Sequence, residues 1–298
     1  MAEAVPALGA KIKRAKKKES SFLVTTKRLL KNKLAVVGLV IIAIQIALAI
    51  FAPLLTFHDP VKQNLKISEL PMFSDGHWLG TDNYGRDVWS RVVFGARISL
   101  IVGIIAVSLG LFGGIILGLL GGYYQKLDGV IMRIVDLLFS FPGILLAMLI
   151  IAILGTSLVN VAIAISIWSI PSCARIVRGS VLSIKEKEYI MAMKSLGASD
   201  LRIMVKHILP NATAPIIVFA TMRMATAILS TASLSYLGLG AQPPTPEWGA
   251  MISQGQAFMW TSPHLTIIPG IAIMLTVFAF NVVGDGLRDA IDPNMDIQ

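Results

Sequence analysis

Residues 98–125 read ISLIVGIIAVSLGLFGGIILGLLGGYYQ and contain no charged side chain. A helix needs about 20 mostly apolar residues to cross the hydrocarbon core of a bilayer. A segment exposed to lipid must pair all its backbone N–H and C=O groups, and a helix does so within itself. The stretch therefore predicts a membrane-spanning helix.

The composition of the whole chain points the same way. Of its 298 residues, 55% are hydrophobic and 14% are charged, and the mean hydropathy is +0.74. A soluble domain is about 25% charged. The run from Leu137 to Ala174 would be about 57 Å long as one helix, so we divide it near Gly155–Ser157 and Asn160. We expect an all-α membrane protein with six spans: Leu34–Leu55, Ile98–Gln125, two within Leu137–Ala174, Asn211–Leu237 and Leu265–Gly284.

Basic residues predict the orientation of the spans. Ten of the 26 Lys and Arg precede Leu34 and are opposed only by Glu3 and Glu19, so this stretch carries ten minus two, or +8. A basic run before a span is typical of a cytoplasmic segment that contacts anionic lipid, and not of nucleic-acid binding. With this segment inside, inner segments hold twenty Lys and Arg and outer segments five. Both termini are therefore predicted to be cytoplasmic.

These patterns predict a linear domain organisation. We expect a basic cytoplasmic segment at 1–33, the first span and an outer loop at 34–97, a transmembrane core at 98–287 with an inner loop at 183–210, and a cytoplasmic tail at 288–298. The first apolar run is too long for the core of a cleavable signal peptide. The single cysteine, Cys173, excludes a disulfide within the chain, and the spacing of Gly114 and Gly118 favours close helix packing.

The inner loop reads SIKEKEYIMAMKSLGASDLRIMVKHILPN, residues 183–211. Ser183 and Glu186 fit a capping box that would start a helix, and Gly197 would end it. Ser199 or Asp200 would cap a second helix, and Pro210 either ends that helix or opens span five. Apolar residues recur at helical spacing in both helices: Tyr189, Ala192, Met193 and Leu196, then Leu201, Met204, Val205 and Ile208. Such a pair either lies flat on the membrane or docks a soluble partner.

The loop resembles the signature loop of ATP-binding-cassette (ABC) importer permeases, which runs Glu-Ala-Ala, three residues, Gly, nine residues, Ile-x-Leu-Pro. Gly197, Leu209 and Pro210 are in register, and Ala192 matches the first alanine. Met191, Met193 and His207 depart from the pattern. Glu188-Tyr189 before the match and His-Ile-Leu-Pro-Asn after it are similar to the peptide/nickel branch of that family.

Three other segments strengthen the resemblance. They are HWLGTDNYGRDVWSR at 77–91, LGLGAQPPTPEWG at 237–249 and NVVGDGLRDAIDP at 281–293. Together they resemble the second permease subunit of dipeptide and oligopeptide importers. Thr221-Met222-Arg223 and the run Phe141–Leu146 look closest to glutathione-importer permeases, which indicates a small anionic peptide as cargo.

The resemblance implies a type I permease bundle in a bacterial or archaeal cytoplasmic (inner) membrane. It implies as partners a second, related permease, two cytoplasmic ATPase subunits and an extracytoplasmic peptide-binding protein. ATP and Mg would bind on the partner subunits, and this chain would bind no cofactor. The residues implied in ATPase docking are Glu188, Tyr189, Ala192, Leu196, Gly197, Ala198, Asp200, Leu209 and Pro210.

Two further groups of residues are candidate sites. Thr81, Asp82, Arg86 and Asp87 lie in the first outer loop, where they form either a turn closed by an Asp–Arg pair or a contact for the binding protein. A metal site with His77 is not expected, because one histidine and scattered carboxylates are a poor ligand set. Arg223 lies deep in span five, where a charge is costly. Arg223 either forms a structural salt bridge or contacts a peptide carboxylate in the pathway. Asp136 is the candidate carboxylate for the salt bridge, unless it pairs with Arg133 instead.

Other functions are less well supported by the sequence. The chain has no phosphate loop ending in Gly-Lys-Ser/Thr, no His-Glu-x-x-His and no Gly-x-Ser-x-Gly, so we expect a non-catalytic subunit. A permease for nickel or a metal chelate remains the alternative, because it shares the same motifs. A secondary transporter would need coupling carboxylates within the spans, where Asp136 is the only candidate, and an intramembrane enzyme would need a catalytic pair there.

Overall fold

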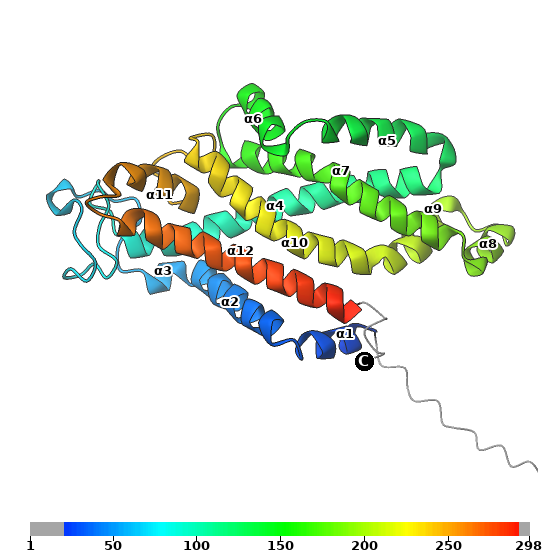
Figure 1. The fold of residues 1–298 in the computed structure, drawn as a ribbon, viewed down its shortest axis with the longest axis horizontal. Coiled ribbons are helices and arrows are strands. Elements are labelled where there is room, and N and C mark those ends of the chain that lie inside the picture. Colours follow the sequence, from blue (N-terminus) through cyan, green and yellow to red (C-terminus); the bar gives the residue numbers. More distant parts are fainter. Residues whose placement is uncertain (1–20, 292–298) are drawn as a thin grey trace, which may run out of the picture.

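The computed structural model describes residues 21–291, so the expectations for the basic stretch before Ser21 and for the tail beyond Ile291 lie outside the described residues. Long helices run roughly along one axis of the molecule (Figure 1). The loop at 56–87 and the α11 region lie at one end, and α8 and α9 form the other end. We call the first the outer end and the second the inner end.

The chain begins with α1 (Ser21–Leu29), α2 (Lys33–Ile50) and α3 (Ala52–Leu55). Asn32 caps α2 by accepting hydrogen bonds from the backbone of Leu34 and Ala35, which explains why the first span starts where the sequence predicts. A long outer loop follows, containing the short helix η1 (Leu65–Ile67). Two tight turns in this loop place Gly80 and Gly85 at φ values of +76° and +68°, a conformation that favours glycine.

The centre of the bundle is a pair of long helices, α4 (Val88–Tyr123) and α7 (Leu158–Lys185). Glycines on α4 let the two backbones approach closely. A Cβ atom at Gly118 would lie 2.6 Å from Val177 Cβ, and one at Gly122 would lie 2.7 Å from Val181 Cβ. The predicted close packing at Gly114 and Gly118 is confirmed, and the partner is α7 of the same chain.

The third span differs from the prediction. The segment forms α5 (Gln125–Phe139) and α6 (Gly143–Leu154), which are bent by 91° at the break between them. Proline at 142 lacks a backbone N–H and disfavours helical geometry in the residue before it, so the uncharged run that begins at Leu137 is interrupted by a break that the prediction of spans did not include. The predicted break before span four is confirmed, with Gly155 at φ +90° and Ser157 capping α7.

The inner loop also differs in its helix boundaries. Ser183 lies inside α7, so the predicted capping box was wrong, and α8 covers Glu188–Ser195. Gly197, at φ +80°, makes the predicted break. Then α9 (Asp200–Ile203), the π-helical turn η2 (Met204–Ile208) and α10 (Leu209–Tyr236) continue as one helix. Pro210 sits in the first turn of α10, directly after the wide π-helical turn, so it neither ends a helix nor breaks this one.

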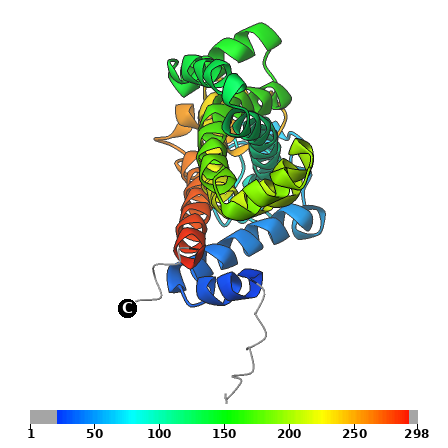
Figure 2. The ribbon, with the colours of Figure 1, turned by 90° about the vertical axis from the view of Figure 1, so that its right-hand side faces the viewer.

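The last part of the chain contains α11 (Trp248–Gly255), η3 (Gln256–Phe258) and α12 (His264–Ile291). Helix α12 packs against α2 and α10. Viewed from the inner end, α1 and α2 lie on the opposite side of the bundle from α5 and α6 (Figure 2). Within residues 21–291, five helices are long and apolar enough to span a membrane, and the bent pair α5–α6 is the sixth candidate.

Helix α4 starts at Val88, ten residues before the predicted beginning of the second span at Ile98, with Asp87 as its N-cap. Its first turns include the buried Arg91, whose Nε lies 3.5 Å from Asp82 Oδ2. The guanidinium of Arg91 donates hydrogen bonds to the carbonyl oxygens of Pro60 and Pro244 at 2.9 and 3.2 Å. These bonds offset the cost of burying the charge, and a sequence count of uncharged residues does not detect them.

Candidate functional site

One face of helix α8 and the residue that follows it present apolar side chains outward at the inner end. Leu196 is 87% exposed, Tyr189 is 41% exposed and Ala192 is also exposed. Three residues of the predicted stripe of the first helix are therefore exposed, whereas its fourth member, Met193, is half-buried. In the second helix the predicted stripe is divided, because Met204 and Ile208 are buried whereas Leu201 and Val205 are exposed.

The other face of the loop anchors α8 to the bundle. Ile190 and Ile203 are buried in a cluster with Val177, Val181 and Ile208. Two polar contacts add to this anchor. Tyr123 Oη at the end of α4 donates to Asp200 Oδ1 at 2.7 Å, and Asn211 Nδ2 on α10 donates to Tyr189 Oη at 3.4 Å. The loop is thus held to α4, α7 and α10 and moves with them.

The predicted docking residues divide between these two faces. Glu188, Ala192, Leu196 and Pro210 are exposed, whereas Ala198 and Leu209 pack against the buried cluster. A groove of about 870 Å³ separates α8 from the α4–α5 turn. Tyr123, Lys126, Lys185, Met191 and Lys194 are among its lining residues. Glu186 and Asp200 also line it, so the inner end combines an exposed apolar ridge with a groove that carries charges of both signs.

Arg223 lies in α10 at its junction with α4 and α7. Its Nη2 donates a 2.6 Å hydrogen bond to Ser172 Oγ of α7, and its guanidinium lies 5.1 Å from the ring centre of Phe219. Beside it is a void of about 10 Å³, lined also by Trp168 and Thr226, which has room for about one water. Sequence reasoning missed Ser172, because a lone serine in an apolar run carries no signal.

Asp136 is not the partner of Arg223. Its Oδ1 accepts from Arg175 Nη2 at 2.5 Å, and this pair links α5 to α7. The expectation that Asp136 pairs with either Arg223 or Arg133 is corrected accordingly. A second pair of the same kind joins Arg178 to Asp128 through two hydrogen bonds of 2.6 Å.

The first outer loop contains the predicted Asp–Arg turn. Arg86 Nε donates to Asp82 Oδ2 at 2.6 Å. All four candidate residues of this loop are buried, with exposures of 0% for Thr81, 8% for Asp82, 1% for Arg86 and 4% for Asp87. Their side chains therefore form the interior of the loop, and the alternative in which they contact a binding protein stays a prediction.

The turn is fixed to the α11 region. Arg86 Nη2 donates to Gln254 Oε1 at 2.9 Å, and Trp248 Nε1 donates to the carbonyl oxygen of Val92 at 3.0 Å. Glu247 is fully buried and caps α11 by accepting from Ala250 N at 2.9 Å. Burial raises the pKa of the Glu247 carboxyl above its usual value, although hydrogen bonds to it act in the opposite direction. The outer loop and the α11 region thus form one cap over the bundle.

Aromatic side chains, which sequence reasoning missed, are exposed on this cap. Trp260 is 98% exposed, Phe57 86%, Phe73 82% and Trp78 67%. Large aromatic residues exposed together are enriched in protein interfaces and at membrane–water boundaries. The sequence signal was present in these residue types, but only the structure shows that they point outward.

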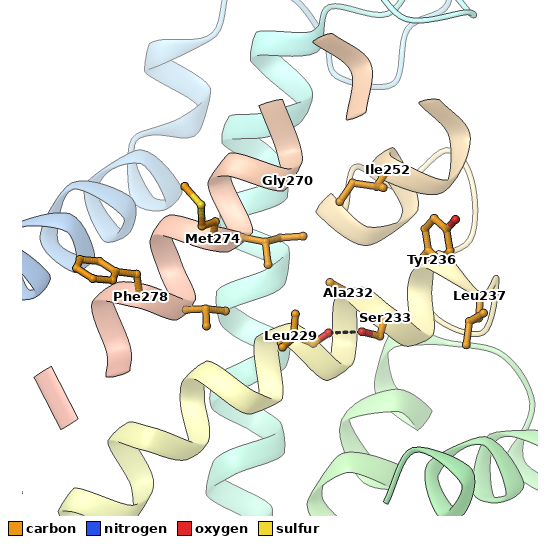
Figure 3. A pocket seen from close by; sticks show the side chains of 11 residues that line it. Leu229, Ala232, Ser233, Tyr236, Leu237, Ile252, Gly270, Met274 and Phe278 are labelled. Carbon is orange, nitrogen blue, oxygen red and sulfur yellow. Dashed lines mark hydrogen bonds between the residues drawn. The ribbon is translucent and has the colours of Figure 1, made fainter. Parts of the chain in front are cut away.

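A groove of about 720 Å³ lies between the outer halves of α10 and α12, beside α11. Its walls are almost entirely apolar and include Leu229, Met274 and Phe278 (Figure 3). Polar groups on the wall are already bonded: the Ser233 hydroxyl donates to the Leu229 carbonyl at 2.8 Å, and Tyr236 Oη donates to Gln256 Oε1 at 2.6 Å. This groove suits an apolar occupant such as lipid or a membrane-embedded partner.

Comparisons with known protein families give two matches. Residues 110–297 match the family described as binding-protein-dependent transport system inner membrane component. Residues 21–71 match the N-terminal transmembrane domain of oligopeptide transport permease C. Together the two matches include the first span, the inner loop and Arg223.

Curated relatives are similar over most of the chain. A dipeptide transport system permease protein of Alkalihalophilus pseudofirmus is 52% identical over 90% of this chain and 88% of its own length. A glutathione transport system permease protein of Pectobacterium atrosepticum is 47% identical over 90% of both. Among solved structures, a chain of the inward-facing MetNI methionine ABC transporter has a TM-score of 0.56 at 20% identity, over 69% of this chain and 98% of that one, which supports the fold.

Proposed function

The chain belongs to the family of binding-protein-dependent transport system inner membrane components, and we propose that it forms half of the translocation pathway of an ATP-driven importer of small peptides. The observation that carries the proposal is the 52% identity to a dipeptide permease over 90% of the chain. A glutathione permease is similar over the same share of the chain, so dipeptides and glutathione are the first substrates to test. A nickel or metal-chelate permease is not favoured by these relatives.

We assign α8 as the docking surface for an ATPase subunit. Leu196 and Ala192 are exposed and apolar, although a water-facing helix of an isolated protein normally presents polar residues there. The groove beside α8, which is lined by Lys126 and Lys194 as well as by Glu186, would receive polar side chains of the same partner. ATP and Mg would bind on the ATPase subunits, and this chain would have no catalytic role.

The continuous helix from Asp200 to Tyr236 supplies a mechanism for coupling. Movement of α8 would be transmitted through the buried contacts of Ile190 and Ile203 to this helix, and along it to Arg223. Type I coupling requires a rigid element that is held in both states. The π-helical turn at Met204–Ile208 and Pro215 are the points on this element where the helix would bend.

Arg223 is our candidate for contact with cargo. Its partner Ser172 is neutral, so the positive charge is not compensated by that bond. A peptide carboxylate that entered the pathway would offer the opposite charge. At the outer end, the exposed Phe57, Phe73, Trp78 and Trp260 are further candidate contacts for a peptide-binding protein, in addition to the buried turn residues.

The remaining assignments concern the assembly. We propose a second, related permease as the membrane-embedded partner, with the apolar groove between α10 and α12 as one of the surfaces that it covers. The described end of α12, α1 and α8 lie toward the inner end (Figure 1). Together with the twenty inner Lys and Arg, this supports cytoplasmic termini in a bacterial or archaeal inner membrane.

Uptake by the reconstituted complex tests the proposed substrate. Proteoliposomes that contain the chain with its co-purified subunits and the binding protein would be given radiolabelled dipeptide, glutathione or nickel. ATP-dependent accumulation of dipeptide or glutathione, absent with a non-hydrolysable ATP analogue, is the expected result. Accumulation of nickel alone, or uptake driven by a proton gradient without ATP, would refute the proposal.

A further inference from the structure

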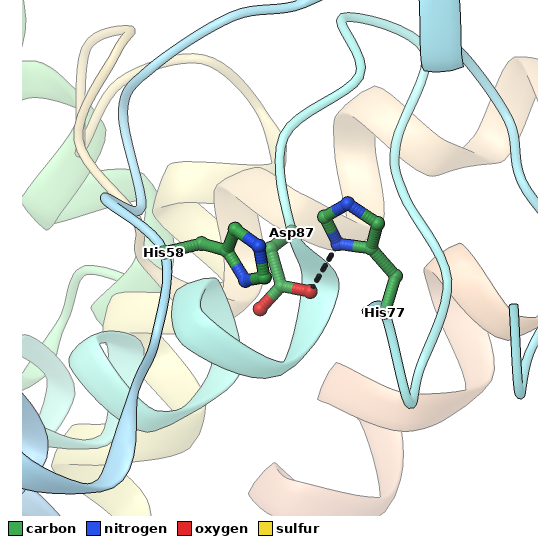
Figure 4. Close-up of side chains that lie close together, drawn as sticks. All are labelled: His58, His77 and Asp87. Carbon is green, nitrogen blue, oxygen red and sulfur yellow. Dashed lines mark hydrogen bonds and ion pairs between the residues drawn. The ribbon is translucent and has the colours of Figure 1, made fainter. Parts of the chain in front are cut away.

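The outer end brings together two histidines and a carboxylate from three separate stretches of the chain. His58 lies just beyond α3, His77 lies in the outer loop, and Asp87 is the N-cap of α4. One potential ligand atom from each of the three lies within 4.8 Å of the other two (Figure 4). His77 and Asp87 are buried, whereas His58 is exposed. The earlier expectation of a poor ligand set considered only one histidine, because His58 is distant in sequence.

Asp87 is held in a single orientation. Its Oδ2 accepts two 2.7 Å hydrogen bonds, from the backbone N and the hydroxyl of Ser90. Its Oδ1 lies 2.8 Å from His77 Nδ1 and faces the histidines. One oxygen is thus committed to the start of α4, and the other is aimed into the cluster. Such fixing of a ligand by a second group is typical of metal sites.

His58, the second histidine of the cluster, takes no part in the contact between His77 and Asp87. The rings of His58 and His77 lie 4.4 Å apart at an angle of 30°, so His58 adds a further ring nitrogen on the exposed side. Two imidazoles and one carboxylate form the kind of three-residue set that holds zinc with an open fourth position. Imidazole also suits copper and nickel, whereas magnesium and calcium prefer oxygen ligands.

The distances require a modest adjustment. Ligand atoms about 2.0–2.2 Å from a tetrahedral zinc lie roughly 3.4 Å from one another. The most distant pair in the cluster would therefore approach by up to about 1.4 Å. His58 is the residue able to make this movement, because it is exposed and lies in the segment between α3 and η1.

We propose that His58, His77 and Asp87 form a binding site for a zinc-class divalent transition-metal ion at the outer end. The ion would connect the segment that leaves the first span to the loop and to the start of α4, with its fourth position open to water. It would thereby fasten the cap above the bundle. This assignment does not depend on the identity of the transported substrate.

Zinc titration of the purified transporter tests the site. The full chain, with its accompanying subunits, would be stripped of metal with a chelator and titrated with zinc chloride against a chromogenic zinc indicator, with magnesium as the comparison ion. We expect one zinc per copy of this chain and no displacement by magnesium. His58→Ala should weaken zinc binding by at least about tenfold, the lower end of the loss seen when even an outer-shell partner is removed. His207→Ala, which removes a histidine at the inner end, should leave it unchanged.

A replacement ligand provides a second test that does not depend on a destabilised cap. His58→Cys should retain zinc binding and, with cobalt as the probe ion, produce the intense near-ultraviolet absorption of a thiolate bound to cobalt. Absence of zinc binding in the wild-type protein would overturn the proposal. Equal binding by the His58→Ala and His207→Ala variants, or no thiolate–cobalt band in His58→Cys, would also overturn it.

Discussion

Arg223 in the middle of α10 donates a 2.6 Å hydrogen bond to the hydroxyl of Ser172 in α7. Among the ion pairs that residues 21–291 form, none joins Arg223 to a carboxylate. A charge within a span is costly unless it faces a cavity, a partner or a counter-charge. The neutral bond to Ser172 orients the guanidinium and leaves its charge free to attract an anionic group in the pathway.

Arg223→Gln is expected to impair uptake of peptides with a free carboxylate. Loss of a hydrogen bond to a charged group costs about 1.5–3 kcal/mol, so kcat/KM should fall by roughly 10–100-fold in reconstituted vesicles. Ser172→Ala keeps the charge and should have a much smaller effect. If the two variants transport equally well at unchanged expression, Arg223 is structural.

Gly118→Val is expected to disrupt the contact between α4 and α7. A Cβ atom there would lie 2.6 Å from Val177 Cβ and 2.7 Å from the carbonyl oxygen of Ala174, and the backbone oxygen cannot rotate away. Overpacking of this kind costs about 1–3 kcal/mol, and occasionally more. The thermal midpoint in detergent should fall, whereas Gly129→Ala, at a position with open space, should not lower it. An unchanged midpoint for Gly118→Val would contradict the helix pairing.

Gly197→Ala and Gly179→Ala form a matched pair. Neither glycine has a neighbouring atom within 4 Å of the added Cβ, but Gly197 has φ +80° whereas Gly179 is helical. Alanine in the left-handed region costs about 1–2 kcal/mol, and alanine in a helix gains up to about 1 kcal/mol over glycine. ATPase activity stimulated by substrate should therefore fall in Gly197→Ala and persist in Gly179→Ala. Equal activities would show that the turn at Gly197 does not position α8.

The sequence was sufficient to predict what depends on local pattern. Uncharged runs located every span except the bent third one, Gly197 marked the turn of the inner loop, and the Asp82–Arg86 pair followed from their spacing. The roles of residues whose partners are distant in sequence were harder to predict. Arg91 is buried near the start of α4, where carbonyl oxygens of Pro60 and Pro244 accept its hydrogen bonds, and no local pattern contains that information.

Burial was the other property that local pattern did not predict. Thr81, Asp82, Arg86 and Asp87 are polar, and polar loop residues are usually exposed, yet here they form the interior of the outer cap. The exposed aromatic residues around them were missed for the same reason. His58 and His77 come together only because the loop between them folds back toward α4.

Glu247→Gln is expected to change how stability depends on pH. The folded-state pKa of Glu247 is raised, chiefly by burial, so the folded protein binds this proton more tightly than the unfolded chain does. The stability that it contributes is fully present below the unfolded-state pKa of about 4.3 and is lost as the pH rises through the folded-state pKa. Relative to wild type, the variant should therefore gain stability as the pH rises.

Thermal midpoints of both proteins between pH 4 and pH 8 test this prediction. Glu188→Gln, which removes an exposed carboxylate from α8, reports the effect of charge removal alone. A difference in midpoint between Glu247→Gln and wild type that stays constant across this range, or a variant that loses stability relative to wild type as the pH rises, would contradict the assignment of a buried carboxyl with a raised pKa.

Co-purification from the native membrane in mild detergent tests whether the chain is a permease subunit that docks ATPases through α8. Attached proteins would be identified by mass spectrometry for the wild type, for Leu196→Glu in the exposed face of α8, and for Leu65→Glu, an equally drastic change at an exposed residue of the outer end. We predict that ATPase subunits and a second permease accompany the wild type and Leu65→Glu, and that Leu196→Glu retains the second permease but loses the ATPases. A wild-type chain that purifies without ATPase subunits, or a Leu196→Glu variant that retains them fully, would contradict this assignment.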